Sequence, residues 1–468
     1  MYDVIIVGAG PAGVYAAYEF MEKAPNLKVL MIDKGKNIYE RKCPLNQHKV
    51  DKCPIIDGVS GCSPCSITNG FGGAGAFSDG KFNITTEYGG WLTDYLDDNI
   101  VLDLINYVDS INLKYGATEV ITDPNTDKVR EIERKAIAVG LKLLRGKVRH
   151  LGTENNLEIQ ARIYDDLKDK IEMRFKTRVI DVLVEDSKVK GVLLDNGEKI
   201  EAKNVFLAVG RDGANFLNDL CKEKGIKLTN NQVDIGVRVE TNDVVMEEIN
   251  KNLYEGKFIF RTTVGTVVRT FCSNPSGYVV VENHSGTMLA NGHAYANKNL
   301  GSNNTNFALL VSHKFSEPFD LPNLYAHQVS RLANELSCNS IIVQRYGDIC
   351  KGRRSTQKRI DEGFVKPTLK EAVPGDLGLV LPYNTMKSII EMIEALDHVT
   401  PGIANEHTLF YGVEAKFYSA RPEIKNNFET KIDGFYVGGD GAGLTRGLAQ
   451  AGANGVFVAR DIINKLKK

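Results

Sequence analysis

The sequence predicts an α/β protein in which a parallel sheet is assembled from both ends of the chain and a mixed α+β domain is inserted between them. Three observations predict this fold. A buried strand, a glycine-rich turn, a helix and a second buried strand follow one another in residues 2–33. Another strand, glycine turn and helix occupy residues 434–465, and residues 231–300 between them are rich in short strands. Since alternating strands and helices form parallel sheets with covered faces, the two ends are expected to share one sheet.

The N-terminal part begins with a βαβ unit. Residues 2–7 and 27–33 are apolar runs with the length of buried parallel strands, and residues 13–23 have the spacing of a helix. Residues 36–90 then lose this periodicity and are rich in Cys, Gly, Pro and Asn. A loop of that length in a compact domain usually has a function, so this segment is a candidate site.

The central part combines helices with short strands. Apolar spacing predicts helices over residues 101–111, 132–144 and 159–171. Strands are expected over residues 177–185, 191–195 and 205–209. Asn196-Gly197 between the last two is a strong hairpin signal.

The composition argues against several classes of function. The chain has 468 residues, too many for one ordinary core, with 43% apolar and 25% charged residues, the balance of a folded globular protein. A net charge of −1 and a pI of about 6.7 lack the basic field that nucleic acid or an anionic membrane would require. No apolar run approaches the ~20 residues of a membrane-spanning helix. With no basic leader before the first strand, a cytoplasmic protein is expected.

The turn after the first strand has the pattern of a phosphate-binding loop. Residues Gly8-Ala9-Gly10-Pro11-Ala12-Gly13 read G-x-G-x-x-G between a strand and a helix. The first glycine permits the tight turn, the second lets a pyrophosphate approach the backbone, and the third lets helix and strand pack closely. Asp33 lies about twenty residues later at the end of the second strand, where its carboxylate can accept hydrogen bonds from ribose hydroxyls. Together these features predict dinucleotide binding.

Two later segments favour FAD over NAD. Residues 205–210 end a short β-meander in Val-Gly, as the corresponding strand of FAD domains does. Residues 434–441 resemble the strand whose acid, here Asp440, binds the pyrophosphate and ribityl region of FAD. The helix that follows, from about Gly447 to Ile463, would direct its positive end at the flavin pyrimidine ring. We therefore predict a Rossmann-type FAD-binding domain.

The predicted cofactor contacts come from five segments of the chain. They are Gly8, Ala9, Gly10, Pro11, Ala12 and Gly13; Asp33 and Lys34; Gly73, Ala74, Gly75, Phe77 and Ser78; Val179 and Gly210; and Gly439, Asp440, Gly447 and Leu448. The expected domains are residues 1–230, the first part of the FAD-binding domain; 231–400, an inserted substrate or cap domain; and 401–468, the second part. The first part contains the Cys-rich loop 36–90 and a helical segment 91–172.

The two ends resemble the glutathione-reductase-like FAD superfamily, and the whole chain resembles one branch of it, a family of bacterial FAD-dependent dehydrogenases. The matching segments are 70–81, 150–154, 234–240, 269–272, 412–414 and 439–455. The resemblance implies FAD and redox chemistry but no substrate, because the substrates of the family are largely unassigned. Residues 416–418 and 444–446 depart from the family pattern, so substrate preference is expected to differ from that of relatives.

Four cysteines fall between residues 43 and 65, and three interpretations remain open. Cys43, Cys53, Cys62 and Cys65 could ligate zinc or an iron–sulfur cluster, since C-x-x-C is the usual chelating unit. Cys62 and Cys65 could instead be a dithiol that exchanges electrons with the flavin. The third interpretation is that the four side chains only pack.

Candidate catalytic groups lie among glycines or on strands of the inserted domain. Ser78, Asp79 and Lys81 follow the Gly73 segment, where the backbone could pass close to flavin N5. Arg238 and Arg269 could bind a substrate carboxylate or form structural ion pairs. His293 is a candidate proton donor, although a lone histidine is more often structural. Glu414 and Arg421 are expected to line the same cleft.

The leading hypothesis is an FAD-dependent oxidoreductase acting on a small molecule, anionic if either arginine binds it. No second G-x-G-x-x-G follows a strand, so NAD(P)H is expected only as a transient donor, if at all, with a protein electron carrier as the alternative. One competing hypothesis is an RNA-modifying flavoprotein with a basic patch at residues 351–359, which the near-neutral charge disfavours. The other is a flavin and iron–sulfur electron-transfer protein.

Overall fold

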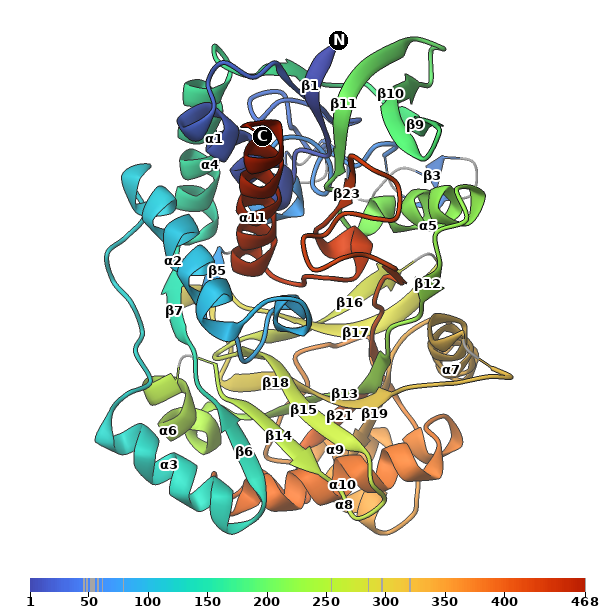
Figure 1. The fold of residues 1–468 in the computed structure, drawn as a ribbon. Helices are drawn as coiled ribbons and strands as arrows, with labels where there is room; N and C mark the ends of the chain where they lie inside the picture. Colours follow the sequence, from blue (N-terminus) through green and yellow to red (C-terminus); the bar gives the residue numbers. More distant parts are fainter. Residues whose placement is uncertain are drawn as a thin grey trace. The chain divides into compact units, whose positions relative to one another are not determined.

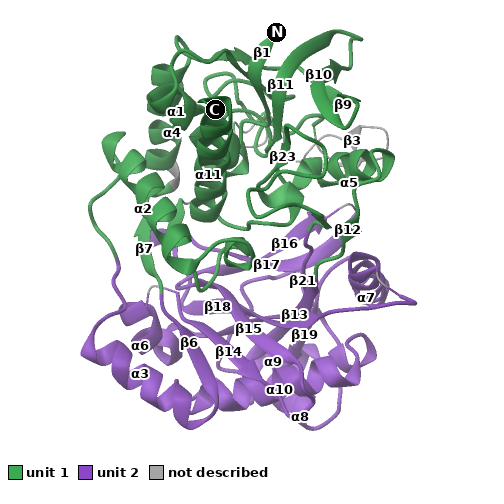
Figure 2. Cartoon of the chain, in the orientation of Figure 1, with its two compact units in different colours: residues 1–121, 146–231, 419–468 green, residues 122–145, 232–418 purple. Residues whose placement is uncertain are grey.

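The chain folds into two compact units, which Figure 2 distinguishes by colour. The computed structural model describes residues 1–44, 47, 49–50, 55–56, 59–60, 62–78, 80–253, 255–284, 286–295, 298–319 and 321–467. Unit 1 comprises residues 1–121, 146–231 and 419–468, and unit 2 comprises residues 122–145 and 232–418. None of the helices in the described part of the chain is long and apolar enough to span a membrane.

Unit 1 is an α/β domain, and Figure 1 labels many of its helices and strands. Its strands are β1 Tyr2–Val7, β2 Val29–Ile32, β3 Ile55–Ile56, β4 Val59–Ser60, β5 Lys81–Ile84, β7 Lys147–His150, β8 Glu172–Arg174, β9 Val179–Glu185, β10 Lys188–Leu194, β11 Lys199–Leu207, β12 Leu228–Thr229, β22 Arg421–Pro422 and β23 Phe435–Val437. Its helices are α1 Pro11–Lys23, α2 Asp98–Lys114, α4 Thr153–Leu167, α5 Ala214–Glu223 and α11 Leu448–Lys467, with 3₁₀ turns η1 Gly73–Phe77, η2 Leu92–Asp94, η3 Arg211–Gly213 and η6 Asp440–Ala442.

The main sheet of unit 1 joins the two ends of the chain. Its strand order is β8-β2-β1-β11-β10-β9, and β23 pairs with β11. β1 runs parallel to both β2 and β11, and β23 runs parallel to β11. The central residues Val4, Ile5 and Ile6 are fully buried because helices cover both faces of a parallel sheet. The predicted Rossmann-type fold assembled from both ends is therefore confirmed.

Helices α1 and α11 approach each other at small residues. A Cβ built on Gly455 of α11 would lie 1.9 Å from the carbonyl oxygen of Ala12 in α1. One turn earlier, a Cβ on Gly452 would lie 2.8 Å from the Tyr15 ring and from Val108 of α2. Because the helix backbones are this close, α11 can pack on the first turn of α1, which places the C-terminal helix beside the glycine-rich turn.

We expect the substitution Gly455→Val to destabilise unit 1. The new side chain has no space beside Ala12, so α11 must move away from α1, and overpacking of this kind costs about 1–3 kcal/mol. The gain in helix propensity from removing a glycine is smaller, about 0.5 kcal/mol. Chemical denaturation followed by circular dichroism checks the prediction. An unchanged midpoint would show that the two helices are not held this closely in solution.

Unit 2 is built on an eight-stranded sheet in the order β20-β19-β21-β13-β18-β15-β14-β6. The strands of this sheet are β6 Leu141–Leu144, β13 Val233–Asn242, β14 Lys257–Arg261, β15 Val267–Asn274, β18 Asn304–His313, β19 Ile342–Arg345, β20 Val373–Pro374 and β21 Leu409–Lys416. Two further strands of unit 2, β16 Tyr278–His284 and β17 Thr287–His293, form a separate antiparallel pair. Its helices are α3 Asp127–Ala138, α6 Asp243–Leu253, α7 Pro322–Leu336, α8 Tyr346–Cys350, α9 Gln357–Asp361 and α10 Tyr383–Asp397. Strand β13 is central and pairs antiparallel with both β18 and β21.

Unit 2 differs from the predicted inserted domain, residues 231–400, because its main segment runs from 232 to 418 and a separate segment, 122–145, also belongs to it. β21, at residues 409–416, pairs with β13, so the unit ends at residue 418. β6 pairs with β14, which brings residues 122–145 into unit 2. The sequence prediction of one helix over residues 132–144 is also wrong, because Gly140 adopts a φ of 79°, ends the helix and starts β6. These pairings are non-local, and apolar periodicity does not reveal them.

A buried carboxylate stabilises the return of the chain to the sheet of unit 1. Burial alone would raise the pKa of Glu429, but hydrogen bonds from Lys425, Lys465 and the amide of Gly434 lower it from the usual 4.5 to about 2. A carboxyl whose pKa falls on folding stabilises the fold above the unfolded value and loses that contribution as the pH drops through the folded one. Glu429 therefore stabilises unit 1 above about pH 4.5, and this stabilisation disappears between about pH 4.5 and 2.

We expect Glu429→Gln to lower the free energy of unfolding by about 2 kcal/mol at pH 7 and to have no such effect near pH 2. Urea denaturation of both proteins across this pH range is the appropriate measurement. A difference that is independent of pH would show that the loss comes from packing and not from the charge.

Candidate functional site

In the turn between β1 and α1, the first and third glycines pack directly against other backbone atoms, whereas the second has free space beside its Cα. A Cβ on Gly13 would lie 1.9 Å from the carbonyl oxygen of Gly8, and a Cβ on Gly8 would lie 2.5 Å from that of Ala208. A Cβ on Gly10 would have no neighbour within 4 Å in the described part of the chain. Helix α1 begins at the next residue, Pro11, so the positive end of the helix faces this space. The geometry fits the close approach of a phosphate group to the backbone at Gly10.

Asp33 lies at the end of β2, next to this turn. Its carboxylate accepts hydrogen bonds from the amide of Ala9 at 2.8 Å and from the amide of Gly35 at 2.7 Å. The side chain is only half-buried, and each carboxylate oxygen keeps a lone pair for a further donor such as a ribose hydroxyl. The neighbouring Lys34 forms an ion pair with Asp212. Asp33 is thus placed to bind a nucleotide, whereas the ammonium of Lys34 already has a protein partner.

The second glycine-rich segment, η1, packs against the first. The amide of Gly72 donates to the carbonyl of Ala9 at 2.7 Å, and a Cβ on Gly73 would lie 2.9 Å from the Cα of Gly10. A Cβ on Gly75 would lie 2.5 Å from Leu448 of α11. The structure therefore brings together the predicted cofactor residues of the first turn, of η1 and of the start of α11.

The third segment leads from β23 into α11. The amide of Gly439 donates to Oδ1 of Asn454 at 3.0 Å, which ties the turn to the helix. The carboxylate of Asp440 accepts a hydrogen bond from Thr445 at 2.7 Å, and burial raises the pKa of Asp440. Gly210 lies between β11 and η3, and a Cβ on it would meet nothing within 4 Å among the described residues. Of the other predicted contacts, Val179 is buried in β9.

Arg41 supports η1 and was not predicted from the sequence. Its guanidinium is buried, donates to the carbonyls of Ser66, Ile67 and Phe71, and lies 4.7 Å from the centroid of the Phe77 ring. Burial lowers the pKa of Arg41 to about 10. The residue connects the end of the cysteine-rich segment to η1. A single arginine in an aperiodic loop carries no signal of this role.

Asn156 of α4 is a second support that the sequence did not indicate. Its side-chain amide donates to the carbonyl of Gly75 at 2.6 Å. Beside this contact lies a small space lined by Pro11, Tyr15, Gly72, Gly75, Phe82, Asn112, Leu151, Asn156, Gln160 and Leu448. Within it, the Tyr15 hydroxyl bonds to Asn112 at 2.5 Å, and burial raises the pKa of Tyr15. The polar groups behind η1 come from three helices, which explains why η1 has a defined path.

The predicted catalytic groups after η1 have structural contacts. The Ser78 hydroxyl donates to the carbonyl of Gly75 at 2.7 Å and accepts from the amide of Gly80 at 3.2 Å, so it closes the turn. Lys81 is half-buried at the start of β5. Asp79 lies outside the described residues.

The two arginines of unit 2 form ion pairs. Arg238 and Glu414 are both fully buried and joined by two hydrogen bonds of 2.9 Å. Arg269, a quarter exposed, pairs with the buried Asp234 at 2.9 Å. These contacts match the structural alternative for Arg238, whereas Arg269 retains exposed surface. His293 ends β17 and has its ring 5.0 Å from that of Tyr295.

The cysteine segment falls only partly within the described residues. Cys43, Cys62 and Cys65 form no disulfide with another cysteine that the structure describes, and Cys53 lies outside the described residues. Nowhere in the described ranges do three or more His, Cys, Asp or Glu side chains gather as a metal site. The choice among metal, dithiol and packing therefore remains a prediction.

The basic segment 351–359 is partly neutralised within unit 2. Arg353 and Arg359 both pair with the buried carboxylate of Asp348, at 2.7 and 3.1 Å. Lys351 lies 3.6 Å from Glu406. These acids reduce the local positive field that RNA binding would require.

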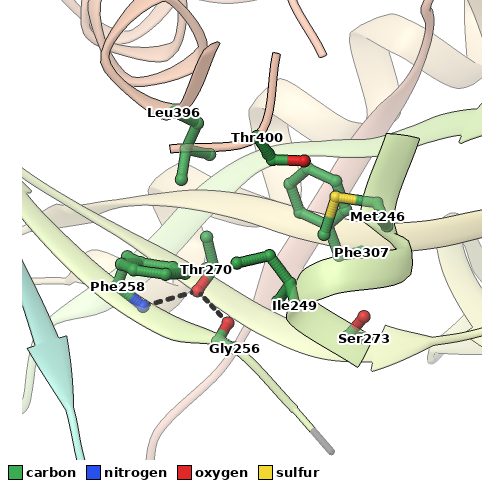
Figure 3. Close-up of a pocket in the computed structure, with 9 residues that line it drawn as sticks. All are labelled: Met246, Ile249, Gly256, Phe258, Thr270, Ser273, Phe307, Leu396 and Thr400. Carbon is green, nitrogen blue, oxygen red and sulfur yellow. Dashed lines mark hydrogen bonds between the residues drawn. The ribbon is translucent and has the colours of Figure 1, made fainter. Parts of the chain in front are cut away.

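A pocket in unit 2 is lined by apolar and hydroxyl side chains, which Figure 3 shows. Its lining residues are Met246, Ile249, Gly256, Phe258, Thr270, Ser273, Phe307, Leu396 and Thr400. The Thr270 hydroxyl is already bonded to the carbonyl of Gly256 and the amide of Phe258, each at 2.8 Å. With no charged side chain in its lining, this pocket is not suited to bind an anionic substrate.

Two protein families match separate parts of the chain. Residues 2–88 match the pyridine nucleotide-disulphide oxidoreductase family, and residues 232–417 match the family described as FAD-dependent protein, C-terminal domain-like. The first match contains the glycine turn, Asp33 and η1, and the second spans most of unit 2.

Similar proteins and structures were found over nearly the full length. An uncharacterized protein of Clostridium beijerinckii is 25% identical over 98% of this chain and 80% of its own length. Quinol fumarate reductase of E. coli is 13% identical over 100% of this chain and 70% of its own, with a TM-score of 0.42. L-proline dehydrogenase of P. horikoshii is 12% identical, covering 99% of this chain and 94% of its own, with a TM-score of 0.37.

Proposed function

We propose that this chain is an FAD-dependent oxidoreductase in which unit 1 holds the FAD, and that the enzyme oxidises or reduces a small anionic molecule. Two family matches support the proposal: residues 2–88 match an oxidoreductase family, and residues 232–417 match a family described as FAD-dependent. The observation that carries the cofactor assignment is the convergence of three glycine-rich segments. The turn at residues 8–13, η1 and the start of α11 contact one another, yet the space at Gly10 stays open. Such a cradle fits a dinucleotide phosphate.

Each part of the cradle corresponds to a part of FAD. The backbone at Gly10 and the N-terminus of α1 would bind the pyrophosphate, and Asp33 would accept hydrogen bonds from the adenosine ribose. Asp440 would bind the ribityl hydroxyls, and η1 with the start of α11 would hold the flavin ring. Bound FAD supplies hydride or electron transfer at its N5 atom.

The protein's own groups orient the substrate and keep the site in place. Arg41 and Asn156 hold carbonyls of the segment around η1, which limits its movement beside the ring. The Thr445 hydroxyl orients the carboxylate of Asp440. In unit 2, Arg269 keeps exposed surface and is our candidate for the substrate carboxylate, with His293 as the candidate proton donor. Arg238 is better explained as a structural residue, because Glu414 already satisfies its guanidinium.

The source of electrons divides this proposal into two versions. In the first, NADH or NADPH docks transiently and reduces the flavin. In the second, a protein carrier would deliver single electrons, and Cys43, Cys53, Cys62 and Cys65 would hold an iron–sulfur cluster that supplies one-electron chemistry. Four cysteines within residues 43–65 favour the second version.

Anaerobic mixing of the purified protein with NADH, with NADPH and with a reduced ferredoxin separates these versions. Loss of the flavin absorbance with a nicotinamide and no protein-bound iron supports the first version. Reduction by ferredoxin alone, with iron and sulfide in the purified protein, supports the second. Failure of all three donors, with the flavin still reducible by dithionite, would contradict both versions.

A further inference from the structure

A short segment of unit 1 pairs with the residues that lead into α11. We call residues 88–91 the strap. The amide of Trp91 donates to the carbonyl of Leu444 at 2.9 Å, and the amide of Arg446 donates to the carbonyl of Gly89 at 2.9 Å. Gly90 and Thr445 form an antiparallel bridge between these two bonds. The strap therefore adds a short β-ladder to the entrance of α11.

The buried side chain of Gln450 fastens the strap to the first turn of the helix. Only 2% of Gln450 is exposed. Its Nε2 donates to the carbonyl of Tyr88 at 3.2 Å, and its Oε1 accepts from the amide of Leu92 at 3.5 Å. A Cβ on Gly90 would lie 2.3 Å from Oε1 of Gln450, so only glycine fits under this side chain. The side-chain amide of Gln450 thus bonds to Tyr88 at the start of the strap and to Leu92, the residue that follows its end.

Arg421 secures the far end of the strap. Its guanidinium lies 4.7 Å from the centroid of the Trp91 ring, and its Nη1 pairs with Asp94 at 2.7 Å. Its Nε donates to the carbonyl of Gly443 at 3.2 Å. Because Gly443 immediately precedes the residues paired with the strap, one arginine connects both strands of the ladder.

The strap lies against the residue from which α11 starts. A Cβ on Gly447 would lie 3.7 Å from both the Cα and the carbonyl oxygen of Gly89, and Gly447 has no other neighbour at this distance among the described residues. A group bound at the positive end of α11 would therefore meet the backbone of the strap on one side.

We propose that the strap forms one wall of the FAD site and that Gln450 is the positioning residue that keeps the strap paired with the residues leading into α11. The inference rests on the proposed function, because it takes the start of α11 as part of the flavin site. Without the two hydrogen bonds of Gln450, the strap would leave α11 more often. The bound cofactor would then dissociate faster, and Trp91, which is half-buried, would become more accessible to solvent.

The test uses Gln450→Leu, which loses both hydrogen bonds, and Gln450→Glu, which keeps the acceptor for Leu92 but loses the donor to Tyr88. Gly90→Ala displaces the strap from the opposite side. Gly197→Ala is the matched control, since Gly197 also has a positive φ but a Cβ there meets nothing within 4 Å. Thermal unfolding of each protein shows whether it is folded.

Two quantities are measured for each variant: the rate of FAD release from the holoprotein, and acrylamide quenching of the fluorescence of Trp91, the single tryptophan of the chain. We expect release about tenfold faster for Gln450→Leu and Gly90→Ala, with an intermediate effect for Gln450→Glu and none for Gly197→Ala. Quenching should increase in the same order. A variant that only had a lower melting temperature would still be folded at the temperature of the measurement. Its Trp91 would then be quenched as in the wild type.

The outcomes separate the two proposals. Wild-type protein that binds FAD, together with variants that release it at the wild-type rate and show unchanged quenching, would overturn the role of the strap and leave the proposed function intact. Wild-type protein that binds no FAD would overturn the proposed function, and the strap would lose its role with it. If Gln450→Leu does not fold, Gln450→Glu and Gly90→Ala decide the question.

Discussion

Replacing Gly10 with valine is expected to leave the protein folded and to weaken FAD binding by about 100-fold, or about 3 kcal/mol. The first atom of the new side chain meets nothing within 4 Å among the described residues, so that part of the fold has space for it. That space is where the pyrophosphate would approach the backbone at the start of α1. Titration of the apoprotein with FAD, followed by flavin fluorescence, measures the loss.

Gly13, the third glycine of the same turn, provides the control for this prediction. A Cβ on Gly13 would lie 1.9 Å from the carbonyl oxygen of Gly8, so Gly13→Ala is expected to lower the melting temperature of the apoprotein, which Gly10→Val leaves unchanged. Wild-type FAD affinity in Gly10→Val would contradict the placement of the pyrophosphate. If both variants lost stability equally, a side chain at Gly10 would disturb the folded protein itself, and the weaker FAD binding could not be assigned to the pyrophosphate.

The largest effect on stability is expected for Arg238→Met in unit 2. This change leaves the carboxylate of Glu414 buried, with Lys416, 3.0 Å away, as its remaining cationic partner. Removing one member of a buried ion pair typically costs about 3–5 kcal/mol, because the other charge has lost its solvation and its partner. Urea denaturation of the wild type and the variant gives the difference directly.

The double substitution Arg238→Met with Glu414→Leu tests the reason for this loss. It removes the buried carboxylate that has lost its two hydrogen bonds from Arg238, so we expect it to recover most of the lost stability. Arg130→Met is the surface control, because Arg130 pairs with the exposed Asp127, and its loss should cost about 1 kcal/mol or less. If Arg238→Met were no worse than Arg130→Met, the pair would not be buried as described.

The sequence predicted those parts of the site that depend on local patterns. The glycines of residues 8–13, the acid at Asp33 and the return strand before Asp440 each have a spacing that follows from strand and helix geometry. The structure places these segments together in unit 1, as the motif requires. Even the aperiodic segment 73–78 could be selected, because glycines among polar residues indicate close approach of the backbone.

The residues that escaped prediction act through contacts between distant segments. Arg41, Asn156 and Gln450 each hold backbone carbonyls of another segment, and no spacing rule identifies such partners. The end of unit 2 at residue 418 was missed for a similar reason, since β21 joins its sheet by pairing with β13. Long-range pairing of this kind is decided by the register of the whole sheet.

The most direct test of the central claim, that unit 1 is built to hold FAD, is the absorbance spectrum of the gently purified protein together with identification of the nucleotide released on denaturation. We expect flavin bands and the release of stoichiometric FAD, with FMN unable to replace it in the apoprotein because FMN lacks the adenosine that Asp33 would bind. A folded protein that contains no flavin, and takes up none when FAD is added to the apoprotein, would contradict it.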